Sequence, residues 1–230
     1  MQKTCWQHLA AHQQVLVVTT PNREEKEGLL HLYERIEKDS PWVPVGEPIA
    51  IVLGKTGLAW GIGLHPPDSK NALLKREGDK KSPAGIFSLG TAFGLVSALK
   101  MASLKLEYLQ FDENSEAVDD PLSSYYNQIV NRQEVTIDWN SSEKMNEETL
   151  YTLGLVVNHN FPNSQPGAGS AIFLHVWRHK HSGTLDCTAM SQENLTKILF
   201  WLKRSKNPAL VQLPVDIYHQ LQEKWSLPQQ

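Results

Sequence analysis

The segment from Gly167 to Leu202 constrains the fold most, because its pattern changes from strand to loop to helix around one cysteine. An apolar run from Ala171 to Leu174 leads into His175, which predicts a buried strand with an imidazole at its end. Cys187 follows a polar loop, and Ser191 then precedes apolar residues at helical spacing, which predicts a capped helix. We therefore expect His175 at a strand end and Cys187 in the loop that enters the helix.

The combination of a histidine with a cysteine predicts nucleophilic catalysis. A free cysteine has a pKa of ~8.5, so the thiol is mostly protonated at neutral pH unless a base lies nearby. We expect His175 to take the thiol proton and return it to a leaving amine, with the carbonyl of Val176 or a neighbouring group orienting the imidazole. Backbone N–H groups near Asp186 and Cys187 would receive the developing oxyanion. The predicted chemistry is acyl transfer.

Spacing alone leaves a purely structural role and a zinc site open for the same residues. An isolated cysteine is more often a small buried apolar residue, and an isolated histidine is usually a satisfied core or surface group. Zinc binding is conceivable because nitrogen and sulfur ligands are present at His175, His179, His181 and Cys187. Their spacing fits no familiar zinc pattern, so we expect neither a metal nor a cofactor.

The same segment resembles the catalytic signature of the L,D-transpeptidase (YkuD-type) family. The similarity lies in the runs GSAIFLHVW and GTLDCTAMS and in the amphipathic helix that follows them. Two upstream stretches are similar to segments of one branch of that family, namely Lys75 with EGDKKSPAGIF at Glu77 to Phe87, and DDPLSSYYNQIV at Asp119 to Val130. The resemblance covers the chain from about Val15 to Leu202.

The resemblance implies a substrate and a set of site residues. Cys187 would attack the L,D bond between the third residue, diaminopimelate, and the D-alanine of a peptidoglycan tetrapeptide, with His175 as base and then acid. Thr184 to Cys187 would fill the family's Ser/Thr-x-Gly-Cys block, and Lys75 to Lys81 would lie at the rim of the substrate cleft. The expected substrate contacts are Arg178, His159, Asn160, Tyr126, Trp177, Thr184 and Thr188. His159 and Asn160 are equally consistent with a strand-end pair that hydrogen-bonds the following loop.

The chain departs from the family pattern next to the cysteine. Many members have a histidine and a glycine directly before the cysteine, whereas Leu185 and Asp186 stand here. Aspartate tolerates left-handed backbone angles better than most residues, so the turn can survive, but its carboxylate would raise the pKa of the thiol. Ala189 stands where many members carry an arginine for a substrate carboxylate. Arg178 is the candidate substitute.

Composition indicates one globular domain over residues 1–230. The sequence is 40% hydrophobic and 20% charged, with a formal net charge of -3 and no long basic run, which argues against nucleic acid as a partner. No window approaches the ~20 apolar residues of a membrane span. The short apolar run Val15 to Val18 predicts a strand and not a signal peptide, so we expect a cytoplasmic protein, or a periplasmic one if a native export signal is missing here. Cys5 and Cys187 could form one bridge at most.

Local patterns predict a mainly β fold with peripheral helices, and the resemblance makes this an L,D-transpeptidase-like, mainly antiparallel β-sandwich or barrel. Further strands are expected at 15–20, 49–53, 83–89, 135–139, 154–159 and 211–213. Further helices are expected from Asn22, with Leu29, Leu32, Tyr33 and Ile36 on one face, and over 142–152 and 216–225.

The expected partner is a peptidoglycan-derived tetrapeptide, and the expected reaction is hydrolysis of its terminal D-alanine. A cross-linking enzyme must meet polymeric peptidoglycan outside the cytoplasm, and this N-terminus shows no export signal. The prediction is therefore an L,D-carboxypeptidase of murein recycling. The alternatives are an L,D-transpeptidase that forms cross-links or exchanges D-amino acids, and a non-catalytic muropeptide-binding module in which Asp186 has disabled the site.

Overall fold

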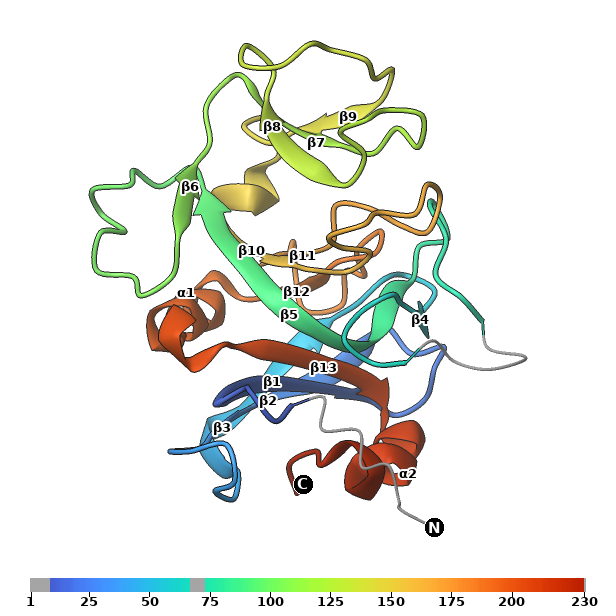
Figure 1. The fold of residues 1–230 in the computed structure, drawn as a ribbon, viewed down its shortest axis with the longest axis vertical. Helices are drawn as coiled ribbons and strands as arrows, with labels where there is room; N and C mark the ends of the chain where they lie inside the picture. The colour runs from blue at the N-terminus through green and yellow to red at the C-terminus, as the bar shows by residue number, and fades with distance from the viewer. Residues whose placement is uncertain (1–8, 67–72, 230) are drawn as a thin grey trace.

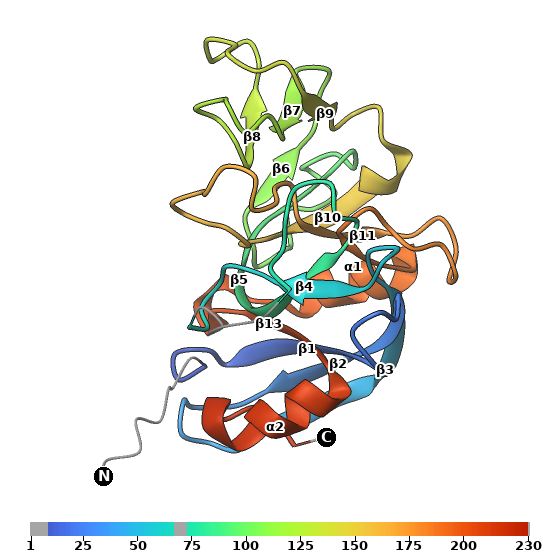
Figure 2. The same ribbon diagram turned by 90° about the vertical axis from the view of Figure 1, so that its right-hand side faces the viewer.

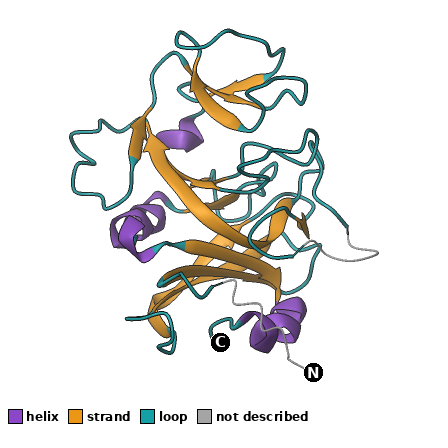
Figure 3. Ribbon diagram, viewed as in Figure 1, coloured by secondary structure: helices purple, strands orange, loops and turns teal. Residues whose placement is uncertain are grey.

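The computed structural model describes residues 9–66 and 73–229, and these form a mainly β structure with helices at its periphery (Figure 1 and Figure 3). The strands are β1 Gln14–Thr20, β2 Glu27–Glu34, β3 Val43–Val52, β4 Leu58–Trp60, β5 Ser82–Gly94, β6 Tyr108–Gln110, β7 Ser115–Val118, β8 Gln128–Asn131, β9 Ser142–Lys144, β10 Leu153–Val157, β11 Phe173–Val176, β12 Thr188–Met190 and β13 Ala209–Pro214. The helices are α1 Gln192–Trp201 and α2 Val215–Trp225, with short 3-10 turns η1 Thr149–Thr152 and η2 Arg204–Lys206.

Eight of these strands close into a barrel. Their order is β10-β11-β12-β3-β2-β1-β13-β5, and β5 pairs again with β10 to complete the circle. Most neighbours are antiparallel, whereas β1 runs parallel to β13 and β11 runs parallel to β12. A separate sheet of β7, β8 and β9 lies at one end of the molecule, and α2 lies at the other (Figure 1 and Figure 2). The predicted mainly β fold with peripheral helices is confirmed, and the more specific family fold stays a prediction.

β1 forms an apolar wall of the barrel in the half away from the small sheet (Figure 2). Its residues Val15 to Val18 have 0% exposure, because one face points into the barrel and α2 packs against β1 and β13 outside. A strand covered on both faces has a continuous apolar sequence instead of an alternating one. Burial of each such side chain stabilises the fold by about 1.5–3 kcal/mol. β1 pairs with β13, and β13 pairs with β5. This wall thus supports β5, which contacts the loop before Cys187.

The helix expected from Asn22 is wrong, because residues 27–34 form β2. β2 pairs with β1 and β3, and its register against β3 shifts between Leu30 and Leu32. The shift advances two positions along β2, from Leu30 to Leu32, and four along β3, from Ile49 to Val45, so the extra residues belong to β3, and β2 pairs with β1 without interruption. Leu30 and Tyr33, three positions apart, are the two buried side chains of β2, and this spacing imitates that of a helix.

Two expectations for the segment before β10 are also wrong. Residues 142–152 do not form one helix but contain β9 and η1, and the Glu148 side chain accepts a hydrogen bond from the N–H of Leu150 at the start of η1. Residues 135–139 are irregular and do not form a strand. Trp139 is held there by a hydrogen bond from its indole to Glu116 at 2.9 Å. Side-chain hydrogen bonds organise this region where local apolar periodicity is weak.

The helix expected after Ser191 is present as α1. The Ser191 side chain accepts a hydrogen bond from the N–H of Asn194 at 3.3 Å, which caps the helix. Leu195, Ile198 and Leu199 are buried, and α1 packs against β10 and β11. Because β12 lies between Cys187 and Ser191, the cysteine precedes a short strand and does not enter the helix directly. No helix among residues 9–66 and 73–229 is both long and apolar enough to cross a membrane.

Candidate active site

Parallel pairing of β11 with β12 brings the cysteine beside the strand that carries the histidine. His175 is opposite Ala189 in the register, so Cys187, directly before β12, lies next to the beginning of β11. The Cys187 Sγ accepts a hydrogen bond from the N–H of Phe173 at 3.3 Å and lies 3.4 Å from the carbonyl oxygen of Ala171. The thiol is thus held by the backbone of 171–173, and its side chain is 5% exposed.

The loop before Cys187 is fixed by hydrogen bonds to one carbonyl oxygen. The Cys187 carbonyl accepts from the hydroxyl of Thr184 at 2.6 Å and from the hydroxyl of Ser82, on β5, at 2.9 Å. Asp186 is not among the described residues with positive φ, so this turn does not require a glycine. Within the described part of the chain, the backbone N–H groups of Asp186 and Cys187 have no acceptor. They are available to a ligand.

His175 is buried and held in one orientation. Its Nδ1 lies 2.8 Å from the carbonyl oxygen of Val176, and its ring packs edge-on against Tyr151 with centroids 5.5 Å apart. A ring nitrogen facing a carbonyl carries the proton, so Nε2 keeps its lone pair. Burial lowers the pKa of His175, and the Val176 contact only partly opposes this. The imidazole is therefore neutral at neutral pH and can accept a proton. The group expected from the sequence to orient the imidazole occupies that position.

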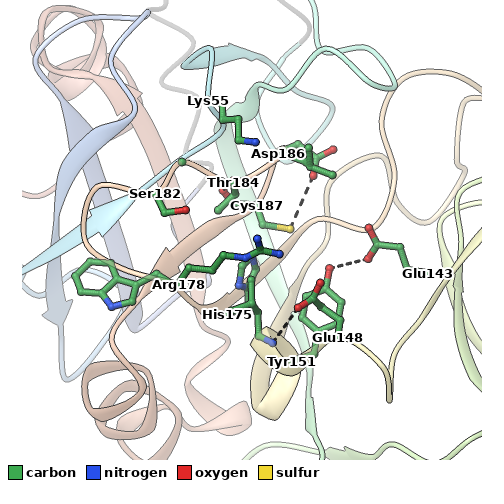
Figure 4. Close-up of a pocket in the computed structure, with 14 residues that line it drawn as sticks. Lys55, Glu143, Glu148, Tyr151, His175, Arg178, Ser182, Thr184, Asp186 and Cys187 are labelled. Carbon is green, nitrogen blue, oxygen red and sulfur yellow. Dashed lines mark hydrogen bonds between the residues drawn. The ribbon is translucent and has the colours of Figure 1, made fainter.

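Both residues line a pocket of about 260 Å³, which we call the cysteine pocket (Figure 4). Its walls carry cations at Lys55 and Arg178 and carboxylates at Glu143, Glu148 and Asp186. In Figure 4 the carboxylates of Glu143 and Glu148 lie on one side of Cys187, with the Arg178 side chain extending toward His175. The complete lining is Lys55, Glu143, Glu148, Leu150, Tyr151, His175, Trp177, Arg178, Ser182, Gly183, Thr184, Leu185, Asp186 and Cys187. A pocket with both charge signs suits a zwitterionic ligand.

The carboxylate of Asp186 is the ionisable group in contact with the thiol. Its Oδ1 lies 3.9 Å from the Cys187 Sγ, and its Oδ2 lies 3.6 Å from the Nζ of Lys75. Burial raises the pKa of Asp186 to about 7, Lys75 opposes the rise, and nearby acidic groups reinforce it. Burial, Asp186 and Glu143 raise the pKa of the Cys187 thiol well above its usual value. The resting site therefore holds a protonated thiol.

Some of the expected substrate contacts reach the cysteine pocket and others do not. Arg178, Trp177 and Thr184 line it, although the hydroxyl of Thr184 is engaged with the Cys187 carbonyl. Thr188 is buried, and its hydroxyl donates to the side chain of Gln212 at 2.7 Å. Tyr126 is buried, and its hydroxyl donates to Glu77 at 2.5 Å. The hydrogen bonds of Thr188 and Tyr126 thus hold neighbouring elements together.

His159 and Asn160 hold the loop that follows β10, outside the cysteine pocket. The His159 Nδ1 accepts from the N–H of Ile62 at 3.2 Å, and Nε2 lies 2.9 Å from the carbonyl oxygen of Ala168. The Asn160 amide donates to two carbonyls of its own loop, those of Gln165 and Gly169. The two side chains have 1% and 0% exposure. This is the loop-bonded arrangement that the sequence left open.

A second cavity, of about 370 Å³, lies between the barrel and the small sheet, and we call it the apolar pocket. His159 is part of its wall. The full lining is Gly90, Thr91, Leu109, Ala117, Asn127, Gln128, Ile129, Val156, Val157, Asn158, His159, Phe161, Ala171, Ile172 and Phe173. None of these residues is an aspartate, glutamate, lysine or arginine. The apolar pocket thus has no charged group with which to perform acid or base chemistry.

Sequence reasoning missed several residues of the cysteine pocket. Glu143 and Tyr151 are joined by a hydrogen bond of 2.6 Å from the phenol to the carboxylate, and both face the pocket (Figure 4). The predicted helix over 142–152 concealed this pair, because it placed the two residues in a different local geometry. Lys55, Glu148 and Ser182 also line the pocket and carried no recognisable motif.

The histidines of the zinc alternative do not gather around the cysteine. His179 and His181 are exposed in the loop after β11, and His181 pairs with Glu27 at 3.0 Å. Among residues 9–66 and 73–229, no group of three or more His, Cys, Asp or Glu is arranged to hold a metal ion. Cys187 is a free cysteine, and Cys5, its predicted possible bridge partner, lies outside the described residues.

Comparisons of the chain with protein-family models, with curated proteins and with solved structures found no match in any of the three. The case for a function therefore rests on the residues and geometry of the site.

Proposed function

We propose that the chain is a cysteine acyl-transfer enzyme in which Cys187 is the nucleophile and His175 the general base. One observation carries the proposal: the two residues line the same pocket from adjacent parallel strands, and the Val176 carbonyl leaves Nε2 of His175 free to accept a proton. A nucleophile next to an oriented, neutral imidazole is the arrangement that acyl transfer requires.

In the proposed first step, the thiol proton passes to Nε2 of His175 while Sγ bonds to the carbonyl carbon of the substrate. The backbone N–H groups of Asp186 and Cys187, which lack an acceptor in the described structure, donate to the resulting oxyanion. Collapse breaks the C–N bond, and His175 returns the proton to the leaving amine. Water then attacks the thioester, giving a carboxylic acid and restoring the thiol.

The raised pKa of Cys187 decides the timing of this proton transfer. Burial and Asp186 disfavour a thiolate in the resting site, so deprotonation accompanies attack and does not precede it. A bound substrate carbonyl would displace water from the pocket, so that His175 and the thiol would share the same water-free surroundings. The proposed enzyme is therefore slow toward small alkylating agents compared with an enzyme that stores a thiolate.

The substrate that we propose is a peptidoglycan tetrapeptide, hydrolysed at the L,D bond before its terminal D-alanine. The resemblance of the 169–191 segment to the L,D-transpeptidase family indicates which bond is cleaved. The size of the pocket favours water as the acceptor of the acyl group. Its 260 Å³ lie just below the usual range of ligand pockets, roughly 300–1,000 Å³, so one peptide end and water fit better than two peptide chains. Cations at Lys55 and Arg178 suit a terminal carboxylate, and the acidic wall suits an amine.

One observation favours a second candidate, a non-catalytic muropeptide-binding module. The Cys187 sulfur accepts a hydrogen bond from the N–H of Phe173, the acceptors for its thiol are oxygens of Ala171 and Asp186, and no hydrogen bond joins it to His175 in the described structure. A thiol restrained in this way and kept protonated by Asp186 could serve only as part of the pocket wall.

The two candidates are separated by incubating the full chain with a soluble tetrapeptide, with and without an added D-amino acid, followed by mass analysis. We expect loss of D-alanine to give the tripeptide, and loss of at least about 10³-fold of that activity in Cys187→Ala. Lys197→Met, in an exposed ion pair on α1, is the matched control and should retain activity. Binding without turnover would favour the module, and D-amino-acid exchange as the main product would favour a transpeptidase.

A further inference from the structure

Lys75 is a buried lysine whose position is unusual. Its side chain is 1% exposed, and its Nζ donates to the Asp79 carboxylate and to the carbonyl of Arg76, both at 2.7 Å. Buried lysines are rare unless they are paired. The backbone of Gly169, in a left-handed conformation with φ +96°, closes over it: a Cβ there would lie 3.1 Å from the Lys75 Cγ. The ammonium is therefore fixed in the protein interior.

The third side of the Lys75 ammonium faces the cysteine loop. An ammonium has three N–H donors, two of which are taken by Asp79 and Arg76, and the Asp186 Oδ2 lies 3.6 Å from Nζ. The other oxygen of Asp186 faces the Cys187 thiol at 3.9 Å. The Asp186 carboxylate thus lies between a buried cation and the nucleophile.

Other ionisable groups near Asp186 determine the balance of charge there. The groups that act on it are Lys75, Glu77 and Asp79 from the loop before β5, Glu143 from β9 and Tyr151 from η1. Glu77 is already hydrogen-bonded by Tyr126 and Ser170, and Glu143 by Tyr151. Lys75 is the one cation within ion-pair distance of Asp186 in the described structure, whereas Lys55, which lines the same pocket, forms no ion pair with it there.

We propose that Asp186 and Lys75 act as opposed positioning residues for Cys187: the carboxylate disfavours the thiolate, and the buried ammonium favours it and holds the carboxylate in place. This inference rests on the proposed role of Cys187 as nucleophile. Charges at such short distances in a buried site change a protonation equilibrium strongly, because solvent screens them little. Burial is the main cause that raises the pKa of the thiol; Asp186 raises it further and Lys75 opposes the rise, in agreement with this geometry.

The test measures alkylation of Cys187 by iodoacetamide across about pH 5 to 10, in a Cys5→Ser background so that one thiol reacts. We expect Asp186→Asn to increase the rate about tenfold near pH 9, where Asp186 with its pKa of about 7 is ionised, which corresponds to about one pKa unit of the thiol, and to move the profile to lower pH. Lys75→Met is then added to Asp186→Asn, so that Asp186 is not left as an unpaired carboxylate, and should slow the reaction relative to Asp186→Asn. Asp79 keeps its hydrogen bonds from the backbone N–H groups of Arg76 and Lys81 in that variant. The matched controls are Glu193→Gln and Glu193→Gln with Lys197→Met, an exposed pair at 2.7 Å, which should leave the rate unchanged.

The proposal is overturned if Asp186→Asn stays within about twofold of wild type at all pH values, or if adding Lys75→Met does not slow the reaction. Thermal unfolding of each variant verifies that it is folded, and Asp186→Gly replaces Asp186→Asn if the asparagine variant is not. Alkylation uses no peptide, so its outcome is independent of turnover. The predicted rate changes without tetrapeptide hydrolysis would refute the proposed function alone, whereas hydrolysis with an unchanged profile would refute the opposed pair alone.

Discussion

The cysteine pocket and the apolar pocket adjoin the same chain segment, 171–173, but are built from different chemistry. Ala171 and Phe173 line the apolar pocket, and their backbone groups also contact the Cys187 thiol of the cysteine pocket. The apolar pocket is the larger, at about 370 Å³ against 260 Å³, yet it has no charged group in its wall. The two pockets therefore differ in chemistry more than in size.

The difference lies in what each pocket does with its histidine. In the cysteine pocket, the Nδ1 of His175 lies at a carbonyl, and its Nε2 has no partner among the described residues. In the apolar pocket, both nitrogens of His159 are occupied by backbone groups of Ile62 and Ala168. Both rings are buried, so burial does not distinguish them. An imidazole can act as a base only where a nitrogen remains unoccupied.

The largest effect expected from this difference between the two histidines is the loss of hydrolytic activity when His175 is replaced. We expect His175→Gln to reduce hydrolysis of the tetrapeptide by about 10²–10⁴-fold, the usual contribution of a general base. Wild-type activity should fall as the pH drops through the pKa of His175, which burial places below its ordinary value of 6.5, because protonation removes the base. The measurement is kcat/KM against pH, and the variant should lack that acidic decline.

Phe161→Ala is the control in the apolar pocket, because that side chain is 56% exposed and lines the cavity. It should keep hydrolysis within about twofold, since a surface substitution away from the chemistry perturbs little. An effect of Phe161→Ala as large as that of His175→Gln would mean that catalysis does not belong to the cysteine pocket alone.

A smaller effect is expected on stability from His159. Burial lowers its pKa to about 4, below the value of about 6.5 that it has when unfolded. The unfolded chain therefore binds more protons between these values, so the stability is fully present above about pH 6.5 and lost as the pH falls toward about 4. The loss is about 3 kcal/mol. Urea unfolding of wild type and His159→Gln from pH 7 to 4 should show a shallower decline in the variant.

His219 on α2 is exposed and provides the control for this measurement. His219→Gln should keep the pH dependence of the wild-type protein, since substitution of an exposed side chain perturbs stability little. An equal decline in wild type and His159→Gln would show that carboxylates, and not the histidine of the apolar pocket, govern acid stability.

The elements that sequence predicts well here are those defined by local apolar pattern. β1, β11 and α1 follow directly from Val15 to Val18, from the run before His175 and from the cap at Ser191. β2 does not, because its two buried side chains, Leu30 and Tyr33, are three positions apart, as in a helix. Only its pairing with β1 and β3 identifies the segment as a strand.

The cysteine pocket was predictable only in its core. His175 and Cys187 lie in one recognisable segment, whereas Lys75 and Asp186 meet through the folding of distant parts of the chain. The sequence marked Asp186 as a departure next to the cysteine but gave no partner for it. Nor did it show that the polar atoms of Tyr126 and Thr188 would be satisfied by internal hydrogen bonds instead of a substrate. Such pairings depend on distances between elements, which composition and spacing do not contain.

The smallest expected effect concerns Ala171, where the two pockets adjoin. Its φ of +52° is in the left-handed region, which costs a residue with a Cβ about 1–2 kcal/mol. The conformation is held by a hydrogen bond from its N–H to the Asn127 side chain at 3.1 Å and directs its carbonyl toward the Cys187 thiol. Ala171→Gly should therefore raise the free energy of unfolding by up to about 1 kcal/mol, after the greater entropy of an unfolded glycine is subtracted.

Ala168→Gly, in the same loop but without a positive φ, is the matched control. There the glycine relieves no strain and only increases the entropy of the unfolded chain, so stability should fall by about 0.5–1 kcal/mol. Urea unfolding of the two variants thus tests a difference of sign at two nearby alanines. If both substitutions destabilise the protein equally, Ala171 is not strained, and the contact between its carbonyl and the thiol is formed without a cost in backbone strain. If the signs differ as expected, the segment that separates the charged pocket from the apolar one is held in place against its own backbone preference by Asn127 and Cys187.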